Sequence, residues 1–165
     1  MKQILQQLFG DERLTSDQTR AIMYEITRQS YPDAQIAAIE AQAEKLRAKG
    51  AKVVEMDLTR TDVSYAVTEA FRCGKIVLAC ATYDGFLFPP MENLLAHLKT
   101  KAFQSRTIAL MENGTWAPMA AKLMRAELEG MKNITVCDTV VTLRSASNPA
   151  AEAQMDALAE ELLAK

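Results

Sequence analysis

From Ala51 onward, short apolar runs alternate with stretches in which apolar residues recur at helical spacing. The apolar runs are typical of strands that are buried on both faces. We predict strands at Lys52–Leu58, Lys75–Ala81 and Arg106–Met111, and a bent or bulged strand at Ile134–Val136 and Val140–Leu143. The intervening and following stretches predict helices at Ser64–Cys73, Met91–Lys101, Ala117–Met131 and Pro149–Lys165. Strands that alternate with helices in this way imply right-handed crossovers and a parallel sheet.

The residues before this region show helical spacing and no convincing strand. An apolar stripe from Ile4 to Phe9 ends at Gly10, and capping residues at Thr15–Gln18 precede a second stripe that ends near Arg28. A third helix is expected from about Pro32 to Gly50, because proline suits the first turn of a helix and glycine its end. We therefore divide the chain into a helical N-terminal segment, residues 1–38, and an α/β domain, residues 39–165.

The composition is that of one well-packed domain and narrows the choice of partners. Of 165 residues, 49% are hydrophobic and 24% are charged, and the formal net charge is -2. This charge balance provides no basic patch for nucleic acid. The three cysteines are typical of a reducing compartment, no apolar stretch approaches the roughly 20 residues of a membrane helix, and no signal pattern follows Met1. We expect a cytoplasmic protein with no membrane or nucleic-acid partner.

Two loops that follow predicted strands are the candidate functional site. They comprise residues 81–90 and 111–118, and in a parallel sheet such loops converge on one crevice at the carboxyl ends of the strands. The residues that we assign to a binding site there are Thr82, Tyr83, Asp84, Gly85, Asn113, Gly114, Thr115 and Trp116.

Trp116 is the residue of this set with the most specific chemistry. A lone tryptophan is usually a core residue, but a position between a buried strand and a helix favours a side chain that faces the crevice, where an indole stacks on a flat aromatic ligand. For Tyr83 two roles are equally consistent with the sequence: its hydroxyl stabilises a turn, or its side chain contacts a ligand. Asp84 and Gly85 form a turn whose backbone amides point outward, toward the edge of a heteroaromatic ring.

Residues for hydrolytic or metal chemistry are lacking. His97 is the only histidine and lies among leucines at helical spacing, which is typical of a structural side chain. No serine or cysteine forms a local motif with it, and no cluster of His, Cys and carboxylate residues has metal-ligand spacing. We therefore assign no catalytic residue and no metal ligand.

The two loops resemble the flavodoxin-like domain of flavodiiron proteins, also called A-type flavoproteins. The matching stretches are Thr82–Gly85, Leu87–Leu95, Gly114–Pro118 and Ala121–Met124, within a similarity that runs from about Ala43 to the end of the chain. This resemblance implies a three-layer sandwich with a parallel sheet, non-covalent binding of FMN, and electron transfer. It places Thr82–Gly85 and Asn113–Trp116 on either side of the isoalloxazine ring, with Trp116 against its face. The diiron domain of that family has no counterpart in these residues, so reduction of oxygen or nitric oxide by this chain alone is not expected.

The resemblance ends where that family has its phosphate-binding loop. The family's first strand ends in a loop rich in hydroxyl and amide groups that holds the FMN phosphate at a helix N-terminus. The corresponding place here is Arg28–Gln35, where Pro32 lacks an amide donor and Asp33 repels a phosphate. If residues 21–26 are helical, the Val53 and Ile76 strands must pair directly or recruit a strand from another chain; if residues 21–26 form a strand, the flavodoxin topology is restored with a damaged loop. The capping residues favour the helix.

Residues 1–38 instead resemble the N-terminal helical segment of anthranilate phosphoribosyltransferase. The match lies in Met1–Leu5, Leu14–Thr15, Arg20–Ala21, Met23, Ile26 and Asp33–Ala38. The transferase's glycine-rich loop and metal-binding acidic residues lie outside this segment, so its activity is not implied. In that family the segment contributes to dimerisation, which implies a homodimer. Two resemblances joined at one helix suggest a recombined or engineered chimera.

Two functional hypotheses follow. The first is a flavodoxin-like electron-transfer domain that binds FMN through an impaired or absent phosphate loop, and that is not an enzyme by itself. The second is a non-catalytic scaffold that binds no flavin and self-associates through its N-terminal helices. A flavin or quinone reductase is a weaker possibility, because no residue marks a nicotinamide site.

Overall fold

The computed structural model describes residues 32–144 and 147–165. The two short helices predicted before Arg28, and the choice between helix and strand at residues 21–26, lie outside the described residues. The described elements are, in chain order, α3 (Pro32–Ala48), α4 (Val63–Arg72), β1 (Lys75–Tyr83), β2 (Phe86–Leu87), α5 (Pro89–Thr100), β3 (Arg106–Asn113), α6 (Ala120–Glu129), β4 (Ile134–Leu143) and α7 (Pro149–Ala164).

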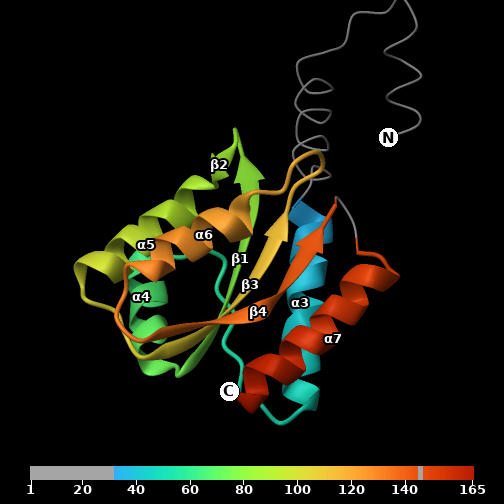
Figure 1. Cartoon of the computed structure of the whole chain (residues 1–165), viewed down its shortest axis with the longest axis horizontal. Coiled ribbons are helices and arrows are strands. Elements are labelled where there is room, and N and C mark those ends of the chain that lie inside the picture. The colour runs from blue at the N-terminus through green and yellow to red at the C-terminus, as the bar shows by residue number, and fades with distance from the viewer. Residues whose placement is uncertain (1–31, 145–146) are drawn as a thin grey trace, which may run out of the picture.

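A four-stranded sheet in the order β2-β1-β3-β4 forms the middle layer of the domain (Figure 1). β1, β3 and β4 are parallel, as their alternation with helices predicts, and only the short β2 is antiparallel to its neighbour. Helices α3 and α7 cover one face of this sheet, while α4, α5 and α6 cover the other. The described chain is therefore a three-layer α/β sandwich, which confirms the predicted fold class.

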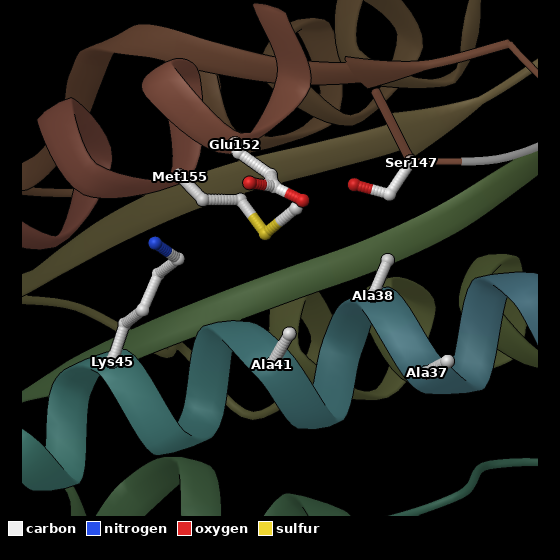
Figure 2. Close-up of a pocket in the computed structure, with 7 residues that line it drawn as sticks. All are labelled: Ala37, Ala38, Ala41, Lys45, Ser147, Glu152 and Met155. Carbon is white, nitrogen blue, oxygen red and sulfur yellow. The ribbon is translucent and has the colours of Figure 1, made fainter. Parts of the chain in front are cut away.

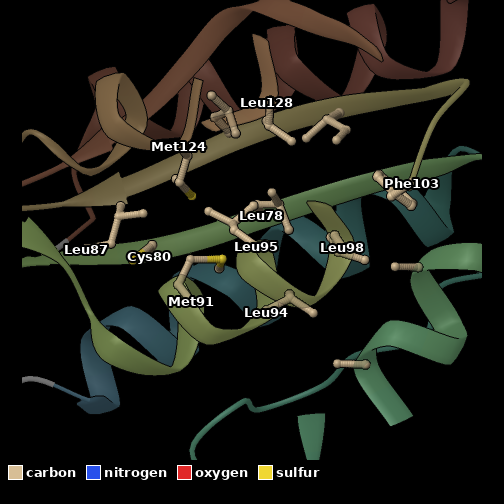
Figure 3. Packing of buried hydrophobic residues seen from close by; sticks show 14 of the residues in the cluster. Leu78, Cys80, Leu87, Met91, Leu94, Leu95, Leu98, Phe103, Met124 and Leu128 are labelled. Atoms are coloured by element: carbon tan, nitrogen blue, oxygen red, sulfur yellow. The ribbon is translucent and has the colours of Figure 1, made fainter. Parts of the chain in front are cut away.

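Each face of the sheet carries its own hydrophobic cluster. On the α5 and α6 side, Leu78 and Leu110 of the strands pack with Leu95, Leu98 and the other leucines and methionines labelled in Figure 3. On the other side, Ala109 and Val141 belong to a cluster with residues of α3 and α7. β3 lies between these clusters, and its side chains from Ile108 to Asn113 are all buried. The central position of β3 explains why its sequence is a continuous apolar run rather than an alternating one.

A bulge in β4 confirms the bent strand that the sequence predicts. The register with β3 shifts, so that Ile108 lies opposite Val136 while Leu110 lies opposite Val140. Glu161 of α7 accepts hydrogen bonds from the bulge amides of Asp138 (2.7 Å) and Thr139 (2.9 Å). The α7 carboxylate thus satisfies amides that have left the regular ladder.

The strand predicted at Lys52–Leu58 is wrong. Residues 51–57 are in no helix or strand, and direct pairing of the Val53 and Ile76 segments does not occur in the structure. The segment keeps the apolar pattern of a strand, since Val53 packs against the α3 and α7 cluster and Met56 against the opposite one. A strand also needs a hydrogen-bonded neighbour, and no described segment pairs with it. The outer edge of β1 from Lys75 to Ala81 consequently has no strand partner among the described residues.

Among the residues that the structure describes, no helix is both long and apolar enough to cross a membrane.

Candidate functional site

The candidate site lies where β1, β3 and β4 end, an edge of the sheet that we call the carboxyl edge (Figure 1). Two loops leave the sheet there. The hairpin turn, Thr82–Gly85, joins β1 to β2, and the tryptophan loop, Gly114–Met119, joins β3 to α6. Parallel topology therefore brings both sequence-predicted loops to one edge, as expected.

The hairpin turn is a two-residue connection between antiparallel strands. Tyr83 lies opposite Phe86, so only Asp84 and Gly85 form the turn, and both have positive φ angles, 49° and 80°. An Asp-Gly pair is one of the few sequences that adopt this conformation without a large steric cost. The ring of Tyr83 contacts that of Phe88 edge to face, with a centroid distance of 5.8 Å. This contact fixes Tyr83 beside the start of α5.

The tryptophan loop is held at both ends by neighbouring strands. At its start the Gly114 amide donates to the Leu143 carbonyl at 3.1 Å. At its end the hydroxyl oxygen of Thr82 accepts from the amides of Met119 (2.9 Å) and Ala120 (3.1 Å). Because this oxygen belongs to the hairpin turn, the same two bonds connect the two loops. Thr82 therefore has a structural role in addition to any contact with a ligand.

Trp116 stands at the tip of this held loop and is 95% exposed. Within the loop the chain turns tightly, since a Cβ on Gly114 would lie 2.8 Å from Pro118 Cα. An indole that packs against almost nothing and yet stands on a constrained loop is available to stack on a flat molecule. Thr115 precedes it on the exposed surface.

Tyr83, Phe86, Phe88 and Trp116 form the exposed aromatic set of the carboxyl edge. They are four of the seven large hydrophobic side chains that are exposed among the described residues, and all belong to or flank the two loops. Phe86 and Phe88 were not among the sequence-predicted site residues. The alternation around the Asp-Gly turn is the signal that would have found them, because it places Leu87 in the core and its two neighbours outside.

Asn113 and Glu112 place polar groups beneath the loops. The Asn113 side chain is 3% exposed, and its amide has no hydrogen-bond partner among the described residues. The Glu112 carboxylate, 8% exposed, accepts from the Ala121 amide at 2.9 Å and from the Thr142 hydroxyl at 3.0 Å. Sequence reasoning did not identify Glu112, because a carboxylate in a buried strand has no local motif.

Cys80 is the cysteine nearest these loops along the chain. Burial raises the pKa of its thiol to about 11, so the reactive thiolate is scarce at neutral pH. In the described part of the chain, no group of His, Cys, Asp and Glu side chains has the arrangement of a metal site. What the carboxyl edge offers is therefore an aromatic surface and hydrogen-bonding groups for binding.

A depression lies between α3 and α7, away from both loops (Figure 2). It measures about 500 Å³ and is lined mainly by Ala37, Ala38 and Ala41 on one side and Met155 on the other. The polar groups of Lys45, Ser147 and Glu152 border it, and no aromatic side chain lines it. It lacks the stacking surface that a flat ring requires, so we retain the carboxyl edge as the candidate site.

Comparison with solved structures shows that the domain has a flavodoxin-like fold. Rubredoxin oxygen:oxidoreductase from Desulfovibrio gigas superposes with a TM-score of 0.73 and 19% identity over 78% of this chain and 32% of that one. Flavodoxin 1 from Bacillus cereus superposes with a TM-score of 0.69 and 12% identity over 81% of this chain and 91% of that one. The flavodiiron protein of Giardia intestinalis superposes with a TM-score of 0.65 and 15% identity over 81% of this chain and 34% of that one. The chain thus spans about a third of the length of the first and third of these proteins and most of the flavodoxin. At these identities the likeness establishes the fold.

The N-terminal residues match a different family. Residues 2–40 match the model of the glycosyl transferase family, helical bundle domain, in agreement with the resemblance noted above. No curated protein matches the chain. The family match ends inside α3, so this helix belongs both to the matched segment and to the flavodoxin-like sandwich.

Proposed function

We propose that this chain is a flavodoxin-like flavin-binding domain, by ancestry an electron-transfer module, that holds the isoalloxazine ring between the hairpin turn and the tryptophan loop. The observation that carries the proposal is the 95% exposed Trp116 on a loop held at both ends. The backbone amides of Asp84 and Gly85 and the polar groups of Asn113 and Thr115 are candidates to bond the ring edge. The residues present therefore suit a flavin ring.

The same chain is poorly equipped for the phosphate of FMN. Where the family that it resembles has its phosphate loop, this chain has Pro32, which lacks an amide hydrogen, followed by Asp33. A helix N-terminus binds a phosphate through free amides and its positive dipole, and a carboxylate in the first turn opposes this attraction. Each lost charge-assisted bond weakens binding by about 1.5–3 kcal/mol, so we propose that ring contacts dominate the affinity.

Titration of the purified full chain with FMN and with riboflavin tests this proposal. If ring contacts dominate, the two dissociation constants should agree within about threefold, because riboflavin differs from FMN only in lacking the phosphate. Quenching of flavin fluorescence gives both constants. Marked preference for FMN would reveal a phosphate site and overturn the impaired-loop proposal while supporting the electron-transfer one. Absence of binding by either flavin would overturn the flavin proposal.

The alternative function is a self-associating scaffold, and the match of residues 2–40 to a helical bundle domain favours it. In this proposal the N-terminal residues of two copies pack together and no flavin binds. It predicts a solution mass of twice 18.3 kDa, and no quenching of flavin fluorescence when FMN or riboflavin is titrated with the chain. A flavin-binding monomer would exclude it.

A further inference from the structure

We infer that Thr82 and Glu112 are positioning residues that join the two loops into one rigid ring-binding surface. Their effect on flavin affinity rests on the function proposed above, whereas their effect on the position of Trp116 does not. Neither residue needs to touch the ligand for this role. Both residues cap the N-terminus of α6.

Helix α6 lacks a cap of its own. Its N-cap residue is Met119, which makes no side-chain capping bond, although the first amides of a helix need acceptors. These acceptors come from two strands instead. The Thr82 hydroxyl oxygen of β1 accepts from Met119 and Ala120, and the Glu112 carboxylate of β3 accepts from Ala121 at 2.9 Å. Residues distant in sequence thus do what an N-cap serine or aspartate does within one helix.

Glu112 extends this connection to the last strand. Its second carboxylate oxygen accepts from the Thr142 hydroxyl of β4 at 3.0 Å. A negative charge at the first turn of a helix is further stabilised by the helix dipole. β1, β3 and β4 are therefore all bonded to the start of α6 or to the carboxylate that caps it.

The tryptophan loop is consequently held by hydrogen bonds at each of its two ends. The Gly114 amide bonds to Leu143 at one end, and the capped amides from Met119 to Ala121 form the other. Only residues 115–118 lie between them, and Trp116 is one of these four. If the caps are removed, the second end is released and the exposed indole gains freedom relative to the hairpin turn. A ring that needs both loops then loses its preformed site.

The test uses Trp116 as its own probe, because it is the only tryptophan of the chain. Thr82→Val removes the acceptor and preserves the shape, whereas Thr82→Ser preserves the acceptor. Glu112→Gln removes the charge of the cap but keeps an acceptor oxygen, whereas Glu112→Ala removes the whole capping group. Glu127→Gln is the matched control, since this carboxylate is on α6 but faces solvent and pairs with Lys99. Circular dichroism confirms that each variant is folded at the temperature of measurement.

In the absence of flavin we expect lower tryptophan fluorescence anisotropy for Thr82→Val and Glu112→Ala, and parental values for Thr82→Ser and Glu127→Gln. Flavin affinity should fall about three- to tenfold in the first two variants, the range that loss of a helix cap provides. Unchanged anisotropy in folded Thr82→Val and Glu112→Ala would overturn the inference. If Glu112→Ala does not fold, folded Thr82→Val decides it: lower anisotropy supports the inference, and unchanged anisotropy overturns it. A chain that binds no flavin refutes the proposed function but leaves the anisotropy comparison intact.

Discussion

Trp116 shows at the scale of one residue how a fold can present an apolar side chain to solvent. Most tryptophans are largely buried, because the indole contributes a large apolar area to a core. Here the tight Gly114–Pro118 turn and the bonds at both ends of the loop leave the side chain 95% exposed. Its exposure therefore comes from backbone constraints on the loop and from the absence of neighbours to pack against.

Trp116→Ala should weaken flavin binding, whereas Trp116→Phe should retain part of the affinity. Offset stacking contributes about 0.5–1.5 kcal/mol beyond buried area, and loss of the indole area adds to this, so we expect a decrease of at least about fivefold. Riboflavin titration measures it. Tyr65→Ala is the control, since Tyr65 is also well exposed but lies on α4. Equal affinities for Trp116→Ala and the parent chain would show that the ring binds elsewhere.

At the scale of single elements, most of the structure follows from local sequence. The helices at Val63–Arg72 and Pro149–Ala164 match their predictions closely, because Asp62 and Asn148 cap them through side-chain bonds to nearby amides. The helix predicted from Ala117 begins three residues later, at Ala120. Its capping groups come from β1 and β3, so no pattern near residue 117 specifies its start.

The β4 bulge and α7 together give a pH-dependent contribution to stability. Hydrogen bonds from Lys165 and from the bulge amides lower the pKa of Glu161 to about 2, from 4.5. Because the pKa is lower in the folded state, this contribution is complete above about pH 4.5 and is lost as the pH falls toward 2.

Glu161→Gln should therefore destabilise the chain by roughly 1–2 kcal/mol near neutral pH, the lower part of the range for hydrogen bonds to a charged group, because solvent screens this site. Chemical denaturation at about pH 7 and about pH 2.5 measures the difference, which should shrink at the lower pH. Glu160→Gln is a suitable control because Glu160 is adjacent and largely exposed. A penalty that is the same at both pH values would assign the effect to packing instead of charge.

At the scale of the whole molecule, the sequence predicted the layers, the direction of the main strands and the meeting of the two loops. It did not predict the state of Lys52–Leu58, because strand pattern is local while strand pairing depends on a distant partner. The same limit applies to the caps of α6, because Glu112 bonds to a residue 9 positions away and Thr82 bonds to residues 37 and 38 positions away. Predictions failed where the deciding contact lies far along the chain.

Among the described residues, the edge of β1 that faces away from β3 has no strand partner from Lys75 to Ala81. Natural edge strands are usually protected by charges, proline or bulges, but Ile76–Ala81 contains none of these. The Gly74 carbonyl accepts from Thr107 of β3, and backbone groups alternate along a strand. The amides of Ile76 and Leu78 therefore face β3, whereas those of Val77 and Ala79 face outward.

Hydrogen exchange followed by NMR should resolve this alternation. If the edge stays open, the amides of Val77 and Ala79 should exchange at least about tenfold faster than those of Ile76 and Leu78, because they lack a hydrogen-bond acceptor in the sheet. Ala109 and Met111 of the central β3 provide the protected reference. Equal, slow exchange of all four β1 amides would contradict an open edge and would mean that another strand, from residues 1–31 or from a second copy, covers it. Dilution would separate these two sources, since only a strand from a second copy is lost as the concentration falls.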